Sequence, residues 1–172
     1  DKLVANNTAV ITCNETHHPS GMLMPLESNT IQSERFRAQI EATEPLKKQL
    51  WQQTIKAKII NQTAVLKKWN IQHNYLITLS QIVKSGNAGN NEAKAAAYYW
   101  SHIFTDAWMF YRRREGPPPN NLLNYGYAIL RATMARAITG AGLLPALGIF
   151  HRNRYNAYCL ADDIMEPYRP FV

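Results

Sequence analysis

The sequence is poor in cysteine, with two cysteines in 172 residues. Cys13 and Cys159 stand far apart along the chain, and neither belongs to a Cys-x-x-Cys pair. A disulfide framework is therefore excluded as the basis of the fold, and the cysteine usage indicates a reducing compartment.

The sequence also lacks a long hydrophobic run. A membrane-spanning helix needs roughly 18 or more consecutive apolar residues. The best candidate, residues 137–150, is shorter and contains three glycines and a proline. No signal peptide is visible. Hydrophobic residues still make up 46% of the chain. We therefore expect a buried core in one compact domain, or in a domain with a small appendage, and no membrane association.

Acidic residues are scarce too, with 12 acids against 19 lysines and arginines and a net charge of +7. This balance favours a polyanionic partner, although an ordinary basic protein also has it. Against that scarcity, Asp162, Asp163 and Glu166 fall within five positions, behind the lone His151. The cluster is the first candidate for a functional site.

Both ends of the chain resemble internal positions of a longer protein. The first residue is Asp1 and not methionine, and the chain stops at Val172 directly after the apolar Phe171. We expect the sequence to be a fragment.

The residue pattern predicts a mainly α-helical fold preceded by a remnant of a β-rich domain. Two apolar segments near the start, residues 8–13 and 21–26, are predicted strands. Helices are predicted from about residue 33, over 44–69, 74–83, 92–110 and 121–140, and over 155–168. The predicted domains are residues 1–28, the β remnant and linker, and residues 29–172, the helical domain.

The acids of the last predicted helix do not all point the same way. At 100° per residue the core face consists of Ala157, Leu160, Ile164 and Tyr168. Asp162 then points toward solvent, whereas Asp163 and Glu166, three residues apart, share one flank and can reach a common point. Two close carboxylates repel each other unless a cation lies between them. That cation can be a divalent metal, a lysine or an arginine, and Arg169 is one turn away.

Two further residues can extend this site. Glu92 heads the apolar stripe of its predicted helix, where a carboxylate is costly unless paired or metal-bound. An acid in a first helical turn also complements the helix dipole, so the position alone does not decide. A single histidine such as His151 is more often a surface residue than a ligand. Two carboxylates and an imidazole suit Mg²⁺ or Mn²⁺, and zinc is possible. Spacing alone does not bring Glu92 to His151.

The basic residues have two interpretations each. The lysines of the 44–69 helix, Lys56 and Lys58 among them, form either a solvated face or a phosphate-binding surface. The arginines at 112–114 either bind phosphate beside neighbouring aromatic residues or complement the end of a helix. We interpret His17 and His18 as structural or exposed.

Five stretches of the chain resemble one known family, in the expected order and over almost the whole length. They are PSGMLMPLESNTIQSERFRAQIEATEPLKKQLWQQTIKAKI, NEAKAAAYYW, GPPPNNLLNYGYAILRA, GLLPALGIFHRN and LADDIMEPYRP. The pairing of GLLPALGIFH with LADDIMEPYRP is the most specific part. The chain resembles the CRISPR-associated adaptation integrase, the first-numbered Cas protein. Among the members of that family, it is most similar to those of the type II systems, in particular of the II-C branch.

The resemblance implies a divalent-metal-dependent DNA endonuclease and integrase, with residues 29–172 as its α-helical catalytic domain. Carried over residue by residue, it makes Glu92, His151 and Glu166 the ligands of Mg²⁺ or Mn²⁺. Asp163 matches a further acidic position found in many members. Some members have aspartate in place of Glu166, which should preserve metal binding.

The same resemblance implies partners and location. The substrate is double-stranded DNA, a short foreign piece (the prespacer) and the repeat array into which it is joined by phosphoryl transfer. The partner is the second-numbered Cas protein, the full-length family member is a homodimer, and the location is the prokaryotic cytoplasm. The residues proposed to hold the DNA backbone are Lys56, Lys58, Arg112, Arg113, Arg114 and Arg152.

The chain also departs from the family pattern. Only the last strands of the β-rich amino-terminal domain are present, and members continue past the final segment. Dimerisation, partner docking and strand transfer are therefore open for this chain. The alternatives are a non-catalytic basic helical scaffold that binds DNA or protein partners and, more weakly, a zinc hydrolase.

Overall fold

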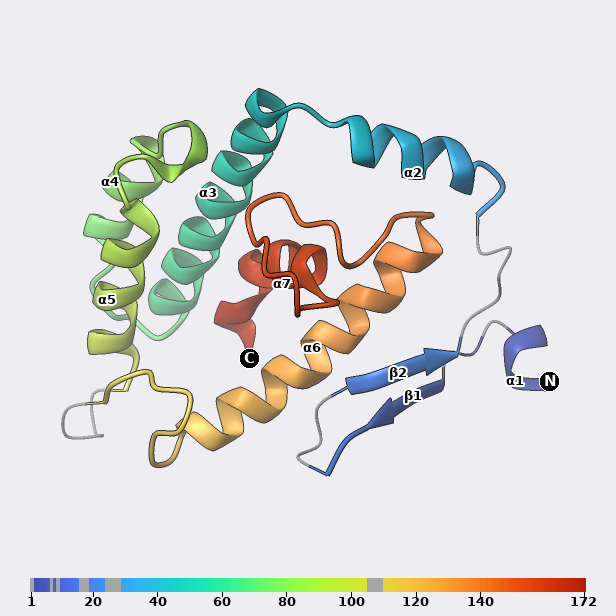
Figure 1. The fold of residues 1–172 in the computed structure, drawn as a ribbon. Helices are drawn as coiled ribbons and strands as arrows, with labels where there is room; N and C mark the ends of the chain where they lie inside the picture. The colour runs from blue at the N-terminus through green and yellow to red at the C-terminus, as the bar shows by residue number, and fades with distance from the viewer. Residues whose placement is uncertain (1, 7, 9, 16–18, 24–28, 105–109) are drawn as a thin grey trace. The chain divides into compact units, whose positions relative to one another are not determined.

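The computed structural model describes residues 2–6, 8, 10–15, 19–23, 29–104 and 110–172. It is mainly helical, as the sequence predicted (Figure 1). The elements in chain order are α1 (Lys2–Ala5), β1 (Val10–Cys13), β2 (Pro19–Leu23), α2 (Gln32–Glu41), α3 (Glu44–Lys68), α4 (Asn74–Gln81), the 3₁₀ turn η1 (Ser85–Asn87), α5 (Asn91–Ile103), α6 (Asn120–Gly140), α7 (Cys159–Met165) and the 3₁₀ segment η2 (Glu166–Phe171). Within the described ranges, no helix has both the length and the apolar character that crossing a bilayer requires.

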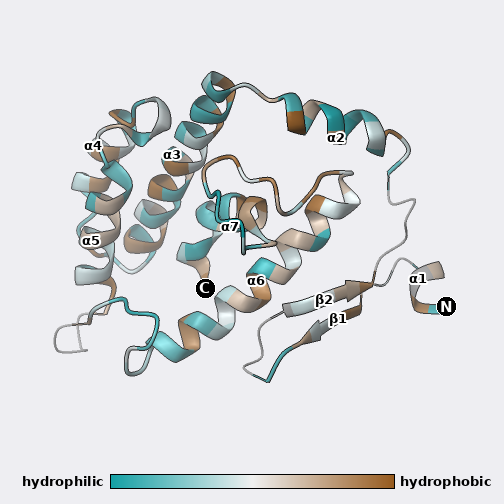
Figure 2. Cartoon of the chain, in the orientation of Figure 1, coloured by the Kyte–Doolittle hydropathy of each residue, from teal (hydrophilic) through white to brown (hydrophobic). Residues whose placement is uncertain are grey.

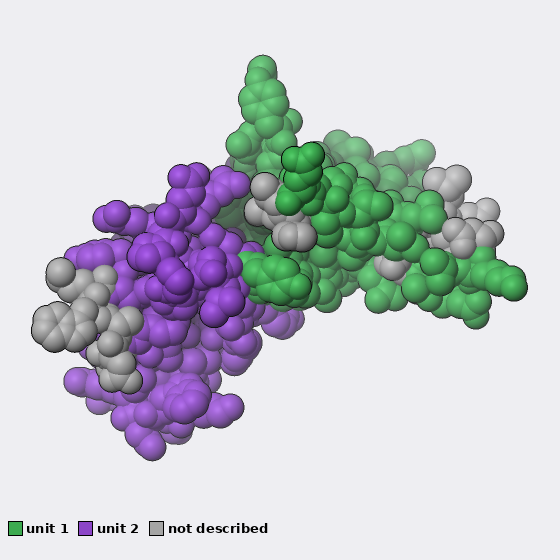
Figure 3. All heavy atoms as spheres, turned by 90° about the horizontal axis from the view of Figure 1, so that it is seen from below, with its two compact units in different colours: residues 1–43, 125–165 green, residues 44–124, 166–172 purple. Residues whose placement is uncertain are grey.

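The chain forms two compact units, which Figure 3 colours green and purple. Unit 1 contains residues 1–43 and 125–165, and unit 2 contains residues 44–124 and 166–172. The predicted boundary between a β remnant at 1–28 and a helical domain at 29–172 stays a prediction. His17, His18 and residues 24–26 of the predicted second strand lie outside the described residues. The helix predicted over 92–110 is shorter than expected: it ends at Ile103, and Phe104 has left the helical conformation with φ −113° and ψ 68°.

Unit 2 is built around α3, with α4 and α5 beside it and η2 packed against it (Figure 1). The buried face of α3 consists of Trp51, Ile55, Ile59, Gln62 and Leu66. The apolar spacing in the sequence predicts instead a face made of Leu46, Leu50, Ile55, Ile59 and Leu66. That prediction is wrong for its first turns, because Leu46 and Leu50 are exposed. Leu50 precedes Ile55 by five residues, about 140° around the helix, whereas Trp51 precedes it by four, about 40°. Polar and apolar positions alternate along α3 in Figure 2.

The start of α5, which carries Glu92, is fixed by a side chain from the preceding loop. Asn87 Oδ1 accepts hydrogen bonds from the backbone N–H of Asn91 at 3.0 Å and of Glu92 at 3.4 Å. Asn90 and Asn91 stand at the start of this helix, and asparagine is a residue type that favours the N-cap position. Asn90, however, takes a left-handed conformation with φ 50° and makes no side-chain cap, so Asn87 satisfies the first amides of the helix.

The last predicted helix is shorter than expected and changes type. Residues 159–165 are α-helical, and residues 166–171 form the 3₁₀ segment η2. Pro167 has no N–H to donate to the carbonyl of Asp163, and it disfavours the α conformation at Glu166. Pro170 likewise has no N–H to donate to the carbonyl of Glu166. The proline pair thus redirects the chain at Glu166, the residue predicted to bind metal.

Unit 1 contains the β1–β2 hairpin, α2, most of α6, and α7. The two strands are antiparallel, with Ile11 opposite Met22. Its core is Ala135, Ile138, Leu160 and Ala161, surrounded by Met22, Met134, Leu143, Ile149, Tyr158 and Ile164. α6 ends at Gly140, as predicted. The chain then turns at Gly142, whose φ is 71° and whose N–H donates to the carbonyl of Thr139.

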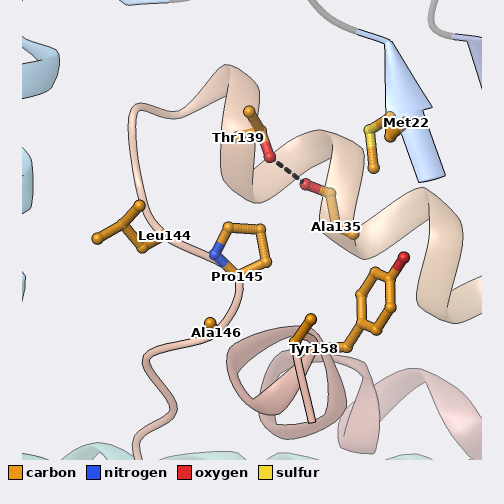
Figure 4. A pocket seen from close by; sticks show the side chains of 8 residues that line it. Met22, Ala135, Thr139, Leu144, Pro145, Ala146 and Tyr158 are labelled. Atoms are coloured by element: carbon orange, nitrogen blue, oxygen red, sulfur yellow. Dashed lines mark hydrogen bonds between the residues drawn. The ribbon is translucent and has the colours of Figure 1, made fainter. Parts of the chain in front are cut away.

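An apolar cavity of about 280 Å³ lies in unit 1 (Figure 4). Its lining is Met22, Ala135, Thr139, Leu144, Pro145, Ala146, Ala157 and Tyr158. The Thr139 hydroxyl already donates to the carbonyl of Ala135 at 2.9 Å. The lining contains no carboxylate or imidazole, so the candidate chemistry lies elsewhere.

Candidate metal centre

Two of the predicted ligands, Glu92 of α5 and Glu166 of η2, converge on one cation in unit 2. Lys58 of α3 donates a hydrogen bond from Nζ to Glu92 Oε1 at 2.7 Å. The same Nζ lies 2.6 Å from Glu166 Oε2. The exposed fractions of the side chains are 12% for Lys58, 25% for Glu92 and 6% for Glu166. The structure therefore brings two acids together that are far apart in sequence.

Glu166 is held from two sides. Arg169 pairs with its other oxygen, Oε1, at 2.9 Å, as the sequence suggested for this arginine. Oε2 is buried, and its partner is the ammonium of Lys58. It is thus a buried carboxylate oxygen that faces a cation.

Two hydrogen bonds from side chains to backbone carbonyls hold η2 against α3 and α5. Asn61, one turn after Lys58 on α3, donates from Nδ2 to the carbonyl of Pro167 at 2.7 Å. The hydroxyl of Tyr99, on α5, donates to the carbonyl of Pro170 at 3.2 Å. Both bonds hold the segment that directly follows Glu166, and they thereby help to fix its carboxylate beside Lys58.

Lys58 remains charged despite its burial. Burial acts to lower the pKa of its ammonium, but the attraction of Glu166 and Glu92 and the hydrogen bonds to them outweigh it. The pKa of Lys58 therefore lies above the ordinary lysine value, and the group is a full cation at neutral pH.

The predicted ligand His151 and the predicted accessory acid Asp163 meet in unit 1. His151 Nδ1 lies 2.6 Å from Asp163 Oδ1. The same carboxylate accepts backbone N–H bonds from Ile149 at 2.6 Å, Phe150 at 2.9 Å and His151 at 3.3 Å. Asp163 is fully buried, so it fixes both the loop and the imidazole. A proton on Nδ1, donated to Asp163, leaves the lone pair of the ring on Nε2.

Asp163 and Glu166, which the sequence places on one flank of the last predicted helix, have different partners. Asp163 bonds the loop at 149–151, whereas Glu166 pairs with Lys58 and Arg169. Glu166 is the first residue of the 3₁₀ segment η2, so the rotation of 100° per residue that relates the two acids does not extend past it.

Asp162 is buried, which contradicts the prediction that it points to solvent. Only 5% of its surface is exposed. Arg131 Nε donates to its Oδ1 at 2.7 Å, and Asn156 Nδ2 donates to its Oδ2 at 2.7 Å. The ion pair with Arg131 of α6 buries a side of α7 that the pattern of apolar residues predicts to be exposed to solvent.

The donor set around Lys58 fits a hard divalent cation. Two carboxylate oxygens converge on one point, and an ammonium stands where a cation would be bound. Oxygen ligands of this kind are those that Mg²⁺ and Mn²⁺ prefer. Within the described ranges, no three His, Cys, Asp or Glu side chains gather closely enough to form a metal site by themselves. The ligand set of Glu92, His151 and Glu166 stays a prediction.

The arginine tract at 112–114 divides into one engaged and two exposed residues. Arg112 donates from Nη2 to Asn124 Oδ1 at 2.6 Å and from Nη1 to Asn120 Oδ1 at 3.1 Å. Arg113 and Arg114 are exposed. Arg112 therefore anchors the start of α6. Lys56 and Arg152 are also exposed, whereas the ammonium of Lys58 is bound by carboxylates. The DNA-binding roles of all six residues stay predictions.

Because Arg112 is hydrogen-bonded to two asparagines and Arg114 is exposed, substitutions at the two positions should change the stability of the protein by different amounts. Arg112→Ala should lower the free energy of unfolding by about 1–2 kcal/mol, because two amide oxygens lose a charged donor. Arg114→Ala should change it by less than about 0.5 kcal/mol, as expected for an exposed side chain. Chemical denaturation of both variants measures the difference, and equal losses would contradict a structural role specific to Arg112.

Comparison with protein families identifies the chain. The family model described as CRISPR associated protein Cas1 matches residues 1–172. The chain belongs to the Cas1 family. A CRISPR-associated endonuclease Cas1 from Neisseria meningitidis serogroup C (strain 8013) is 41% identical over 172 residues, which are 99% of this chain and 56% of that protein. The predicted family is thus confirmed, and the type II subtype stays a prediction.

Solved structures show the same fold. A casposase bound to its integration product has a TM-score of 0.75 at 23% identity, over 98% of this chain and 52% of that one. A chain of a partial Cas6-RT-Cas1–Cas2 complex has a TM-score of 0.73 at 23% identity, over 98% of this chain and 56% of that one. This Cas1-family chain spans about half the length of the curated relatives that it matches.

Sequence reasoning missed the role of Lys58 within the site. The lysine was grouped with its neighbours on the polar side of α3, and nothing local distinguishes it from the exposed Lys56. One signal was available. Lys58 follows the buried Ile55 by three positions and precedes Gln62 by four, so it lies close to the buried face of the helix.

Proposed function

We propose that this chain is the metal-binding part of a DNA endonuclease and integrase that joins short foreign DNA to a CRISPR repeat array. The observation that carries the proposal is the convergence of Glu92 and Glu166 on a single, largely buried cation. Membership of the Cas1 family supports the reaction class, because curated relatives carry the name endonuclease.

The proposed ligands are Glu92, Glu166 and His151, with Mg²⁺ or Mn²⁺ as the cofactor. When bound, the cation would supply Lewis acidity at a phosphodiester oxygen and lower the pKa of an attacking water or DNA 3′-hydroxyl. Arg169 orients the carboxylate of Glu166 through Oε1. The place of His151 as third ligand rests on the family pattern and on the chemistry of its ring.

Asp163 would tune His151. Accepting a hydrogen bond from Nδ1–H fixes the tautomer and the direction of the ring. In this tautomer Nε2 either binds the cation or accepts a proton during the reaction. Asp163 is thereby a positioning residue, not a ligand.

The proposed substrate is double-stranded DNA, as prespacer and as repeat. Lys56, Arg113, Arg114 and Arg152 are exposed cations that can contact phosphate without reading base sequence. A casposase bound to an integration product and a complex containing Cas1 and Cas2 share the fold, which supports DNA and Cas2 as partners. Homodimerisation and a prokaryotic cytoplasmic location complete the proposal.

The proposal predicts that DNA cleavage depends on metal while DNA binding does not. Purified protein should cleave labelled duplex DNA with Mn²⁺ and stop when EDTA is added, because the carboxylates alone cannot polarise a phosphodiester. His151→Ala should abolish cleavage and retain DNA binding in a filter or gel-shift assay. His102→Ala, a histidine outside the proposed ligands, is the matched control.

Two outcomes of that assay would contradict the proposal. Binding of DNA without cleavage under any divalent metal would indicate the basic helical scaffold instead. Cleavage restored by Zn²⁺ but not by Mg²⁺ or Mn²⁺ would indicate a zinc hydrolase.

A further inference from the structure

We propose that Lys58 is a built-in competitor of the divalent cation. Its ammonium neutralises Glu92 and Glu166 in the metal-free protein and leaves them when the metal binds. The inference rests on the proposed function, because it assumes that this carboxylate pair is part of the metal site.

The first argument is that both cations need the same oxygens. Nζ lies 2.7 Å from Glu92 Oε1 and 2.6 Å from Glu166 Oε2. Bonds from Mg²⁺ to carboxylate oxygen are about 2.0–2.1 Å long, so a metal on these two atoms would overlap the ammonium. Two positive charges at such separation also repel strongly in a site that is mostly buried.

The second argument is that the local charge is balanced only while Lys58 is present. The charged groups in contact are Glu92, Glu166, Lys58 and Arg169, two of each sign. Removing the ammonium leaves an uncompensated negative charge beside Glu92, which is unfavourable in a part-buried site. A divalent cation takes the local sum of charges from −1 to +1. Exchange of one cation for the other therefore never leaves the two carboxylates without a positive charge between them.

The third argument is that Lys58 can leave while Arg169 stays. Lysine carries its charge on a flexible four-carbon stem, and 12% of this side chain reaches solvent. Arg169 contacts Oε1 of Glu166, the oxygen that Lys58 does not use. Glu166 therefore keeps its orientation through Arg169 when Oε2 changes partner.

Direct titration of Mn²⁺ into the purified protein tests the inference, using calorimetry with no DNA present. Lys58→Met should bind Mn²⁺ about tenfold more tightly than the unsubstituted protein, because the competing state is removed. Lys56→Met is the matched control. It removes the same charge from an exposed position on the same helix and should leave the affinity unchanged.

A second measurement uses the unsubstituted protein, so it tests the inference even if Lys58→Met does not fold. Brief acetylation of the unsubstituted protein, read by mass spectrometry, should modify Lys58 slowly without Mn²⁺ and several times faster with it. Lys56 should react at the same rate in both conditions.

The outcomes separate the two proposals. A saturable Mn²⁺ site whose affinity is unchanged or weakened by Lys58→Met, with Lys58 equally protected in both conditions, overturns the competitor role and leaves the proposed function intact. Absence of a saturable Mn²⁺ site in both the unsubstituted protein and Lys58→Met overturns the metal-dependent function and the competitor role together.

Discussion

Replacing Asp163 with alanine is expected to lower the free energy of unfolding by about 4 kcal/mol. The fully buried carboxylate accepts bonds from three consecutive backbone amides and from the His151 ring. Its removal leaves part-buried donors unsatisfied, at about 1–3 kcal/mol each, and opens a cavity. The loop at 149–151 should then lose its fixed conformation.

Two companion variants separate the lost bonds from the lost volume. Asp163→Asn keeps the shape and one acceptor oxygen, and it should recover about half of the stability. Gly148→Ala should destabilise the same loop by a steric clash. The added Cβ would lie 2.8 Å from Asp163 Oδ2 and would also overlap the carbonyl oxygen of His151. Chemical denaturation measures all three, with the exposed Glu115→Gln as control. A loss below about 1 kcal/mol for Asp163→Ala would contradict this role.

Glu166→Gln is expected to reduce Mn²⁺-dependent DNA cleavage about a thousandfold. Glutamine keeps the size of the side chain but removes the charge on which a hard cation depends, at a cost of several kcal/mol in transition-state stabilisation. Glu166→Asp keeps the charge on a shorter side chain and should retain most of the activity at saturating Mn²⁺. Initial cleavage rates, measured as a function of Mn²⁺ concentration, provide the comparison.

Stability data distinguish a catalytic loss from misfolding. Glu166→Gln also weakens the pairs with Lys58 and Arg169, so some destabilisation of unit 2 is expected in the metal-free protein. The variant should nevertheless remain folded and bind DNA as the unsubstituted protein does. Cleavage by Glu166→Gln at the normal rate would remove this residue from the proposed ligands.

The helical architecture could be predicted from the sequence because local signals agree. The long helix of α3 begins beside Pro45 as expected, and α6 covers almost the range that was predicted. The predicted ends of the helices were less accurate than their existence. The change at Glu166 depends on Pro167 and Pro170, which the periodicity of the apolar residues does not register. The cap by Asn87 depends on three left-handed residues in the preceding loop.

The candidate site could be predicted only in part. The family resemblance selected Glu92, His151, Glu166 and the accessory Asp163. The structure pairs Glu92 and Glu166 with Lys58, and His151 with Asp163. The partners themselves were not predictable, apart from Arg169. Lys58 meets Glu92 across 34 positions and Arg131 meets Asp162 across 31, and such pairs arise from packing that one sequence does not specify.

The most direct test of the account is to locate the metal. Crystals of the protein grown with Mn²⁺ and measured for anomalous scattering should show one strong peak. It should lie within roughly 2–2.3 Å of an oxygen from Glu92, an oxygen from Glu166 and a ring nitrogen of His151, with Lys58 withdrawn. A peak on other residues, or a Lys58 ammonium still between the two carboxylates at saturating Mn²⁺, would contradict the account.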